Sequence, residues 1–445
     1  MKRFKHIFSA ILAVILINLT TEVAAQDFSR DKDSDISVQN SRVNEEATAW
    51  LDSVDISLLT CGPGQEVWSY YGHTALRIQN KAMGTDVAVN WGMFSFNQSC
   101  FVLRFVFGLT DYQIGIYPMS DFIAEYAHEG RWVRQQRLRL SRIEKLGILR
   151  SIDKNAQPEN RVYRYNFFYD NCTTRAREMI LSNIGNQSTN FKDIPTTSTY
   201  REEIHKLNGQ HRWARFGNDL LLGCQADRPI SQREWEFLPD NLSKDFATEG
   251  RTDFIDASQT TDGKTNTTSD SGYITLVDET SDIIPVQAQI TDDTPVTPQM
   301  IAIALAIIII GTTVRECVKK KNYWWFDAIL LVLTGLPGLI LFTMIFSQHP
   351  TVQINFQILI LNPLNLIFAW KTVKRMKAGR QYFELLGWLL LIALFMQIWQ
   401  NYAEGMSILA LSLLARYCVK STMMDLSPNN YGLQKHIVKK FRKNK

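Results

Sequence analysis

The sequence predicts an exported α+β domain followed by an all-α transmembrane domain of five helices. Hydrophobic residues make up 45% of the 445 residues, but they gather in two parts of the chain. One is a short apolar run near the N-terminus, and the other is a series of long apolar segments after residue 297. Between them lie about 200 residues of mixed composition, which is enough for one folded core.

The N-terminus has the pattern of a secretory signal peptide. A basic start at residues 2–5 is followed by an apolar run at 7–19 and a small-residue cleavage site ending at Ala25. We therefore expect residues 1–25 to be removed; an uncleaved anchor is the alternative, and it would add one helix. Either outcome leaves the next domain exported. Residues 26–46 are polar and predict a disordered mature N-terminus.

Five apolar segments near the C-terminus predict five membrane-spanning helices. They comprise residues 299–314, 323–346, 351–370, 382–400 and 406–419. Each approaches the ~20 residues that cross a bilayer, although the first and last are short. Lys and Arg follow the first, third and fifth segments, whereas the loops 347–350 and 401–405 contain neither. Basic loops stay in the cytoplasm, so this pattern predicts a multi-pass protein of the bacterial inner membrane. Its N-terminal domain would be periplasmic and its basic tail, residues 421–445, cytoplasmic.

The rest of the composition excludes several kinds of protein. The net charge of +4 hides the uneven distribution of Lys and Arg among the loops. That distribution reflects membrane orientation, so no nucleic-acid partner is expected. No Cys or His spacing is typical of a zinc site and no glycine motif is typical of a phosphate loop, so we expect no metal and no cofactor. Asp327 and Glu384 lie near the starts of their segments, where an interfacial position explains them, so we do not expect transport.

The exported domain comprises about residues 47–246, and the Asp-, Thr- and Ser-rich residues 247–298 predict a linker, because they cannot bury enough apolar surface to fold alone. This domain carries one promising nucleophile. In YNFFYDNCTTR, residues 165–175, a turn-like Asp-Asn pair precedes a run of helix formers, so Cys172 is predicted at a helix N-terminus. The positive end of a helix lowers the pKa of a thiol there. The alternative is a buried, inert cysteine.

A base and an orienting group are available nearby in the predicted sheet. In GHTALRI, residues 72–78, a glycine turn delivers His73 to the start of an alternating strand, where a general base can be held firmly. Asn90 lies in the next predicted strand, residues 86–96, and could face His73. Two alternatives remain open. One is that His73 has a purely structural role. The other is that a bulge beside Gly92 explains why an asparagine stands at position 90 within a strand.

These motifs resemble a known family. Six motifs occur in the order seen in the Lnb family, the lipoprotein N-acyltransferases of Bacteroides-type bacteria. They are GHTALRI, NWGMFSF at 90–96, YNFFYDNCTTR, DLLLG at 219–223, DRP at 227–229 and EFLP at 236–239. The resemblance covers residues 57–242 as motifs and the later helices as architecture. The family is similar to circularly permuted papain-like thiol enzymes, which implies an antiparallel sheet with a helix-borne nucleophile, Cys172, a base, His73, and a third polar member, Asn90. Cys224 departs from the family pattern, since a small residue is expected after DLLLG.

The resemblance implies acyl transfer from a membrane phospholipid to the α-amino group of a diacylglyceryl-cysteine lipoprotein through a Cys172 thioester. Substrate-binding candidates are Arg175, Arg77, Thr173 and Tyr169, although an exposed helix charge explains Arg175 as well. If Cys172 is a free thiol, the other three exported cysteines, Cys61, Cys100 and Cys224, can form at most one disulfide, and the sequence leaves their state open.

Two other functions remain open at this point. A papain-like peptidase or amidase acting on peptidoglycan would use the same Cys and His with water as the acceptor. A non-enzymatic membrane receptor or assembly factor would keep both residues for structural reasons. Five membrane helices favour transfer between lipids, since a cell-wall hydrolase needs only a tether.

Overall fold

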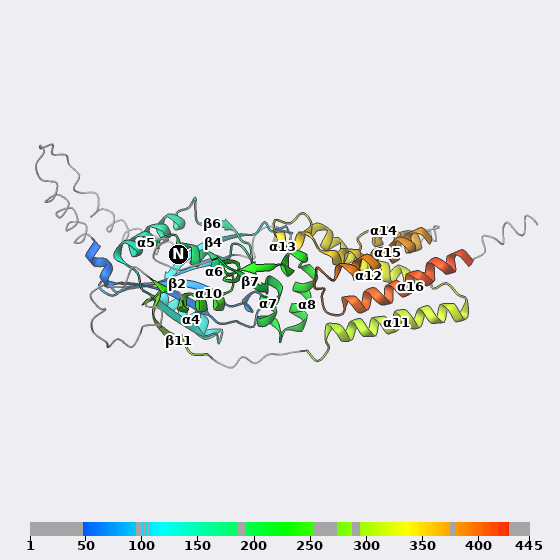
Figure 1. Cartoon of the computed structure of the whole chain (residues 1–445), viewed down its shortest axis with the longest axis horizontal. Helices are drawn as coiled ribbons and strands as arrows, with labels where there is room; N and C mark the ends of the chain where they lie inside the picture. The colour runs from blue at the N-terminus through cyan, green and yellow to red at the C-terminus, as the bar shows by residue number, and fades with distance from the viewer. Residues whose placement is uncertain are drawn as a thin grey trace, which may run out of the picture.

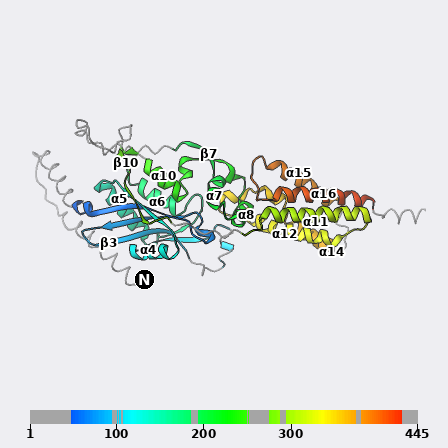
Figure 2. The ribbon, with the colours of Figure 1, turned by 90° about the horizontal axis from the view of Figure 1, so that it is seen from below.

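The computed structural model describes residues 48–94, 100, 103–104, 107–184, 193–248, 250–251, 274–286, 294–373 and 380–426. The predicted signal peptide, the polar segment 26–46, most of the predicted linker and nearly all of the basic tail lie outside these residues. A sheet-containing α+β domain is followed by a bundle of apolar helices, and the two lie end to end along the long axis of the molecule (Figures 1 and 2).

The main sheet has seven antiparallel strands in the order β11-β5-β1-β2-β3-β4-β6. The strands are β1 (Val54–Cys61), β2 (His73–Asn80), β3 (Thr85–Met93), β4 (Asp111–Pro118), β5 (Val133–Leu138), β6 (Val162–Arg164), β7 (Pro195–Thr199), β8 (Pro229–Ser231), β9 (Gly250–Arg251), β10 (Ile274–Thr275) and β11 (Val277–Ile284). β7 pairs with β8 and β9 with β10 as small separate ribbons.

Helices cover both faces of this sheet. The helices of the first domain are η1 (Ala49–Ser53), η2 (Val67–Ser69), α4 (Met119–His128), α5 (Arg142–Ala156), α6 (Cys172–Leu181), α7 (Tyr200–Asn208), α8 (Arg212–Leu221), η3 (Cys224–Asp227), α9 (Gln232–Trp235) and α10 (Pro239–Thr248). Because side chains alternate along a strand, Leu58 and Leu76 pack against α5 and α6 on one face, while Leu59 and Ala75 pack against α4 on the other.

The segment predicted as a linker contributes a strand to the sheet, which corrects that prediction. β11 pairs with β5, and its acidic side chains meet the basic ones of β5: Asp282 pairs with Arg134 at 2.9 Å and Asp278 with Arg137 at 2.7 Å. Its low hydrophobicity suits this edge position, where five of its eight side chains are exposed and cross-strand charge pairs take the place of a buried face.

The second domain contains α11 (Pro298–Lys319), α12 (Trp324–Met344), α13 (Pro350–Gln353), η5 (Phe356–Leu359), α14 (Asn365–Val373), α15 (Arg380–Met396) and α16 (Met406–Leu426). Among the described helices, α11 and α12 are long and apolar enough to cross a membrane.

The third predicted span, residues 351–370, is broken into α13, η5 and α14, so it is not one continuous helix. Pro363 has no backbone N–H and disfavours a helical Asn362, which ends the turn that follows η5. The irregular stretch packs closely on α12, where a Cβ added to Gly338 would lie 2.1 Å from the carbonyl oxygen of Leu361.

The helices α11 and α16 are longer than predicted because charged residues near their ends are paired inside the bundle. We call Glu316, Asp327, Arg416 and Lys420 the buried charge cluster; all four are at most 3% exposed. Arg416 Nε donates to Asp327 at 2.7 Å, and Lys420 Nζ donates to Glu316 at 2.9 Å. Asp327 therefore belongs to an interhelical network, which the sequence did not predict.

One end of the sheet faces the helical domain. The end of β1, the start of β2 and the end of β3 lie together at this end, because Cys61 pairs with His73 and β3 runs antiparallel to β2. Just before β4, the backbone N–H of Gln348 donates to the carbonyl of Phe107 at 3.0 Å. Residues at this end of the sheet therefore lie toward the helical domain.

Candidate active site

The helix α6 begins at Cys172, as its sequence predicts. Asn171 is the N-cap: its side chain accepts from the backbone N–H of Thr174 at 2.9 Å, and the hydroxyl of Thr174 accepts from the backbone N–H of Asn171 at 2.9 Å. The amide of Asn171 also donates to the carbonyls of Phe167 and Phe237 at 2.8 and 2.9 Å. These bonds fix the start of the helix, and with it the Cys172 thiol, against the end of the sheet.

His73 begins β2 and faces Asn90 on β3. The His73 Nε2 atom is hydrogen-bonded to Asn90 Oδ1, and the Asn90 amide donates to the hydroxyl of Tyr117 on β4 at 2.8 Å. Because Nε2 is held by Asn90, Nδ1 is the ring nitrogen left to interact with Cys172, whose thiol is close enough for the imidazole to lower its pKa. Cys172, His73 and Asn90 are therefore connected in that order, an arrangement that would suit a nucleophile, a base and an orienting amide.

β3 is irregular at this point, close to the Cys172 thiol. Its pairing with β4 shifts register between Asn90 and Met93, and Gly92 has a φ of +92°. A Cβ on Gly92 would lie 3.9 Å from both Cys172 Cβ and His73 Cε1. Both interpretations of Asn90 made from the sequence thus describe the structure: it faces His73, and it lies beside a bulge.

The electrostatics favour a thiolate beside an imidazolium. Burial on its own would raise the pKa of Cys172, but the charge and hydrogen bond of His73 outweigh it and lower the pKa from 9.0 to about 7. For His73, burial lowers the pKa, while the thiolate charge and the hydrogen bonds with Cys172 and Asn90 raise it, and the net direction is upward. Each group therefore stabilises the charged form of the other.

The thiol opens into a small cavity of about 130 Å³. Its walls are mainly aromatic and apolar, and the lining residues are Trp68, Tyr71, Gly72, His73, Gly92, Phe94, Tyr112, Tyr165, Phe167, Asn171, Cys172, Thr173, Phe237, Leu238 and Pro239. Several of these wall residues belong to a hydrophobic cluster that continues to Met344 and Val352 of the helical domain. The cavity wall is therefore largely apolar, and part of it packs against residues of the helical domain.

Comparison with known families identifies both halves of the chain. The model of the Lnb N-terminal periplasmic domain matches residues 43–205, and the model of the Lnb transmembrane domain matches residues 289–425. The chain belongs to the Lnb family. It is accordingly a membrane protein with a periplasmic domain followed by a transmembrane domain. Comparisons with curated proteins and with solved structures gave no significant match.

Within this Lnb-family chain, one of the four predicted substrate-binding residues lines the cavity. Thr173 does so, and its hydroxyl is 3.0 Å from that of Thr74 and 3.8 Å from the Cys172 sulfur. Arg77 lies farther along β2, where it forms a bidentate pair with Asp86.

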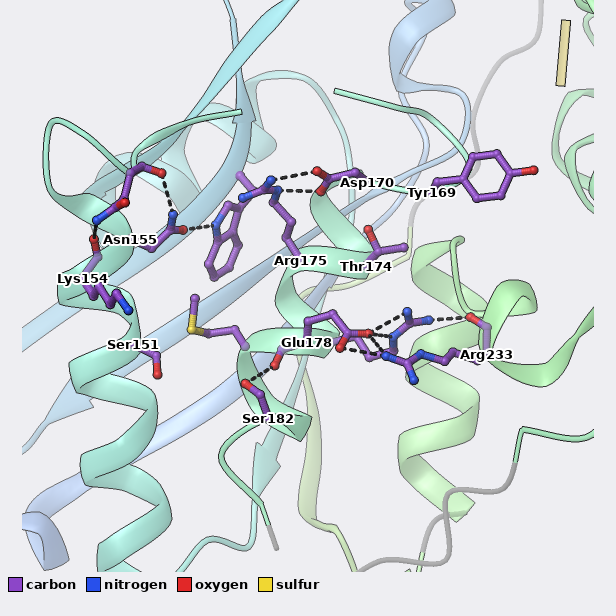
Figure 3. Close-up of a pocket in the computed structure, with 14 residues that line it drawn as sticks. Ser151, Lys154, Asn155, Tyr169, Asp170, Thr174, Arg175, Glu178, Ser182 and Arg233 are labelled. Atoms are coloured by element: carbon purple, nitrogen blue, oxygen red, sulfur yellow. Dashed lines mark hydrogen bonds and ion pairs between the residues drawn. The ribbon is translucent and has the colours of Figure 1, made fainter. Parts of the chain in front are cut away.

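Arg175 and Tyr169 line a separate, larger cleft of about 730 Å³ that is bordered by α5 and by residues of α6 other than Cys172 and Thr173 (Figure 3). There, Arg175 forms a bidentate pair with Asp170, at 2.6 and 2.8 Å, and stacks over the Tyr163 ring.

Several residues at this Lnb-family site could not be identified from the sequence. Tyr117, which holds Asn90, is 27 residues away and is brought near only by the pairing of β3 with β4. Thr74 was visible only as part of the GHTALRI motif. Phe237 and Leu238 belong to EFLP, a motif that the resemblance flagged without giving it a role. None of the four exported cysteines forms a disulfide among the described residues.

Proposed function

We propose that this protein is a lipoprotein N-acyltransferase that transfers an acyl chain from a membrane phospholipid to the α-amino group of a diacylglyceryl-cysteine lipoprotein. The observation that carries the proposal is the connected Cys172, His73 and Asn90 chain, set in an apolar cavity at the end of the sheet that faces the helical domain. A thiol enzyme that takes its substrate from a bilayer needs this placement. The order along the chain, with the strand His before the helix Cys, is that of a circularly permuted papain-like enzyme.

The first step forms a thioester. The Cys172 thiolate attacks the carbonyl carbon of a phospholipid ester, and the tetrahedral intermediate collapses when the ester C–O bond breaks. The protonated His73 gives its proton to the leaving alcohol oxygen, so a lysophospholipid departs and the acyl chain stays on sulfur. The backbone N–H of Cys172, in the first turn of α6, is a donor for the oxyanion, since first-turn amides have no partner within their helix.

The second step forms the amide. The lipoprotein α-amine attacks the thioester carbonyl, neutral His73 accepts a proton from the amine, and the C–S bond breaks to restore the Cys172 thiolate. Water would compete with the amine, so the aromatic walls of the cavity favour transfer over hydrolysis.

The proposal places the catalytic domain in the periplasm and the C-terminus in the cytoplasm, with the protein in the inner membrane. Two features support this orientation. The loops without Lys or Arg, 347–350 and 401–405, lie on the side of the catalytic domain, where Gln348 bonds Phe107 and Glu404 pairs with Arg212. The basic residues 319–321 lie at the opposite end of α11 from its start beside that domain.

The test is mass spectrometry of lipoprotein N-termini from cells that lack their own N-acyltransferase. We expect an N-linked acyl chain in cells that express the unaltered protein, and none with Cys172→Ala or His73→Ala. Cys100→Ser is the matched control, because this exposed cysteine is not among the residues that line the cavity. If the unaltered protein is present in the membrane and adds no acyl chain, the proposal is wrong, and a peptidoglycan peptidase becomes the leading function.

A further inference from the structure

The two domains are joined by a set of buried hydrogen bonds that neither domain could satisfy alone. The last carbonyls of any α-helix have no partner within the helix, and those of α8 end at the domain boundary. Gln357 Nε2 donates to the carbonyl of Asp219 at 2.8 Å, and Asn355 Nδ2 donates to that of Leu220 at 2.8 Å. The helical domain thus caps a helix of the catalytic domain.

The catalytic domain in turn donates hydrogen bonds to the helical domain. Buried irregular backbone is tolerated only where its polar groups find partners, and the break after α13 has such groups. The backbone N–H of Gly223 donates to the carbonyl of Thr351 at 2.8 Å, and that of Cys224 donates to the carbonyl of Ile354 at 2.9 Å. The break in the third apolar segment is therefore matched to the DLLLG segment that it receives.

Three side-chain amides form the centre of this contact, and we call Asn355, Gln357 and Gln400 the amide clamp. They are 7%, 0% and 1% exposed. Gln400 Nε2 donates to Asn355 Oδ1 at 2.8 Å and to the carbonyl of Leu222 at 3.0 Å, while Gln357 Oε1 accepts from the backbone N–H of Ala403 at 3.0 Å. Such a fully bonded buried network specifies one geometry, because a shifted docking would leave several polar groups unpaired.

The clamped segment is connected directly to the cavity wall. Asn208, at the end of α7, and Asn218, in the last turn of α8, both donate to the hydroxyl of Tyr71. Tyr71 lines the cavity and precedes His73 by two residues. Nearby, Arg201 is 1% exposed and binds Asp219 at 2.7 Å, which ties α7 to the clamped end of α8.

We infer that the amide clamp docks the catalytic domain on the helical domain in one position, and that this position sets the Cys172 cavity at the level of the phospholipid ester. The inference rests on the proposed function. It makes Asn355, Gln357 and Gln400 positioning residues, and it gives the transmembrane domain a role beyond anchoring.

The test compares two glycine substitutions near the same helix end. In Gly223→Ala, the new Cβ would lie 2.1 Å from the carbonyl oxygen of Ile354, so the docked segment must move away. Gly217→Ala, in α8, is the matched control, since nothing lies within 4 Å of its added Cβ. Cys224 is a natural probe, because its backbone is part of the contact.

Three quantities are measured in membranes: the labelling rate of Cys224 by a membrane-impermeant maleimide, the acyl transfer rate, and the pH midpoint of Cys172 alkylation. For Gly223→Ala we expect Cys224 labelling to rise about fivefold or more as the contact opens. Transfer should fall about tenfold or more through misplacement of the site, with an unchanged Cys172 midpoint. The control should match the unaltered protein in all three.

Each failure has its own meaning. Unchanged Cys224 labelling would overturn the docking contact, and increased labelling with normal transfer would overturn its positioning role. A shifted Cys172 midpoint would also overturn the inference, since the change would then reach the site through the catalytic fold itself. If the unaltered protein transfers no acyl chain, the proposed function fails, and Cys224 labelling still decides whether the clamp docks the domains.

Discussion

Replacing His73 by alanine removes the group that holds Cys172 as a thiolate, so the variant should lose reactivity at neutral pH and recover it in alkali. The pKa of Cys172 is about 7 in the protein and 9.0 for an ordinary thiol. At pH 7 the thiolate fraction would therefore fall from about one half to about one hundredth, a change of about 50-fold. Burial raises the pKa of the thiol and remains in the variant, so about 50-fold is a lower limit.

The rate of alkylation should fall by less than the thiolate fraction. A thiolate becomes more nucleophilic as its pKa rises, and two units of pKa correspond to about a six- to tenfold gain. Combining the two effects gives about five- to eightfold slower alkylation at pH 7. Acyl transfer should fall further, by about 10²- to 10⁴-fold, since the leaving alcohol also loses its proton donor.

The assay is iodoacetamide alkylation of Cys172 over a range of about pH 5 to 10, quantified on its peptide by mass spectrometry. In the unaltered protein, reactivity should disappear as the pH falls through about 7, because the lowered pKa keeps the thiolate only above that value. In His73→Ala the same loss should occur near pH 9 or above. Cys61, whose burial raises its pKa to about 12, should stay unlabelled in both proteins and reports on folding. A midpoint that stays near 7 in the variant would refute the reasoning.

Three further substitutions separate the roles of other residues. Asn90→Ala should lower acyl transfer about 10- to 100-fold by releasing the His73 ring. It should also raise the pH midpoint of Cys172 alkylation, because the Asn90 amide stabilises protonated His73. Unchanged transfer would leave Asn90 with a structural role only. Arg175→Ala should change transfer by less than about threefold, since this side chain is paired outside the cavity, and a larger loss in the lipoprotein assay would indicate contact with substrate. Arg416→Met should destabilise the helical domain by about 3–5 kcal/mol, because two buried carboxylates would then face Lys420 alone. Thermal unfolding in detergent measures this loss, and a melting temperature equal to that of the unaltered protein would contradict it.

The predictable parts of the site depend on short stretches of sequence. The Asp-Asn pair before Cys172 fixes a helix start within four residues, through the bonds between Asn171 and Thr174. The glycine before His73 fixes a strand start in the same way, since Gly72 has a φ of +77°. Local signals of this kind act through neighbouring backbone groups and need no knowledge of the rest of the fold.

The features that were missed depend on partners far away in the chain. In the sequence, β11 resembles a linker because its acidic residues have no basic partners nearby. Their partners on β5 lie more than 130 residues earlier. The break at 354–364 is hidden within an apolar segment, because hydropathy averages over Asn355 and Gln357. Those side chains are stabilised by carbonyls of another domain, which no window of the sequence contains. The ion pairs of Asp327 were missed for the same reason, since its partner Arg416 lies 89 residues away.

The same balance of effects that activates the thiol also suits the two steps of the proposed reaction. In the free enzyme, the thiolate of Cys172 raises the pKa of His73 and so favours the protonated imidazole, which could act as an acid toward the leaving alcohol of the proposed first step. Once the thioester forms, the sulfur carries no charge, and this influence disappears. Burial, the largest effect on His73, then lowers its pKa and leaves a neutral base ready for the incoming amine. In the proposed reaction, the charge on one sulfur atom would thus favour His73 as an acid in the first half-reaction and as a base in the second.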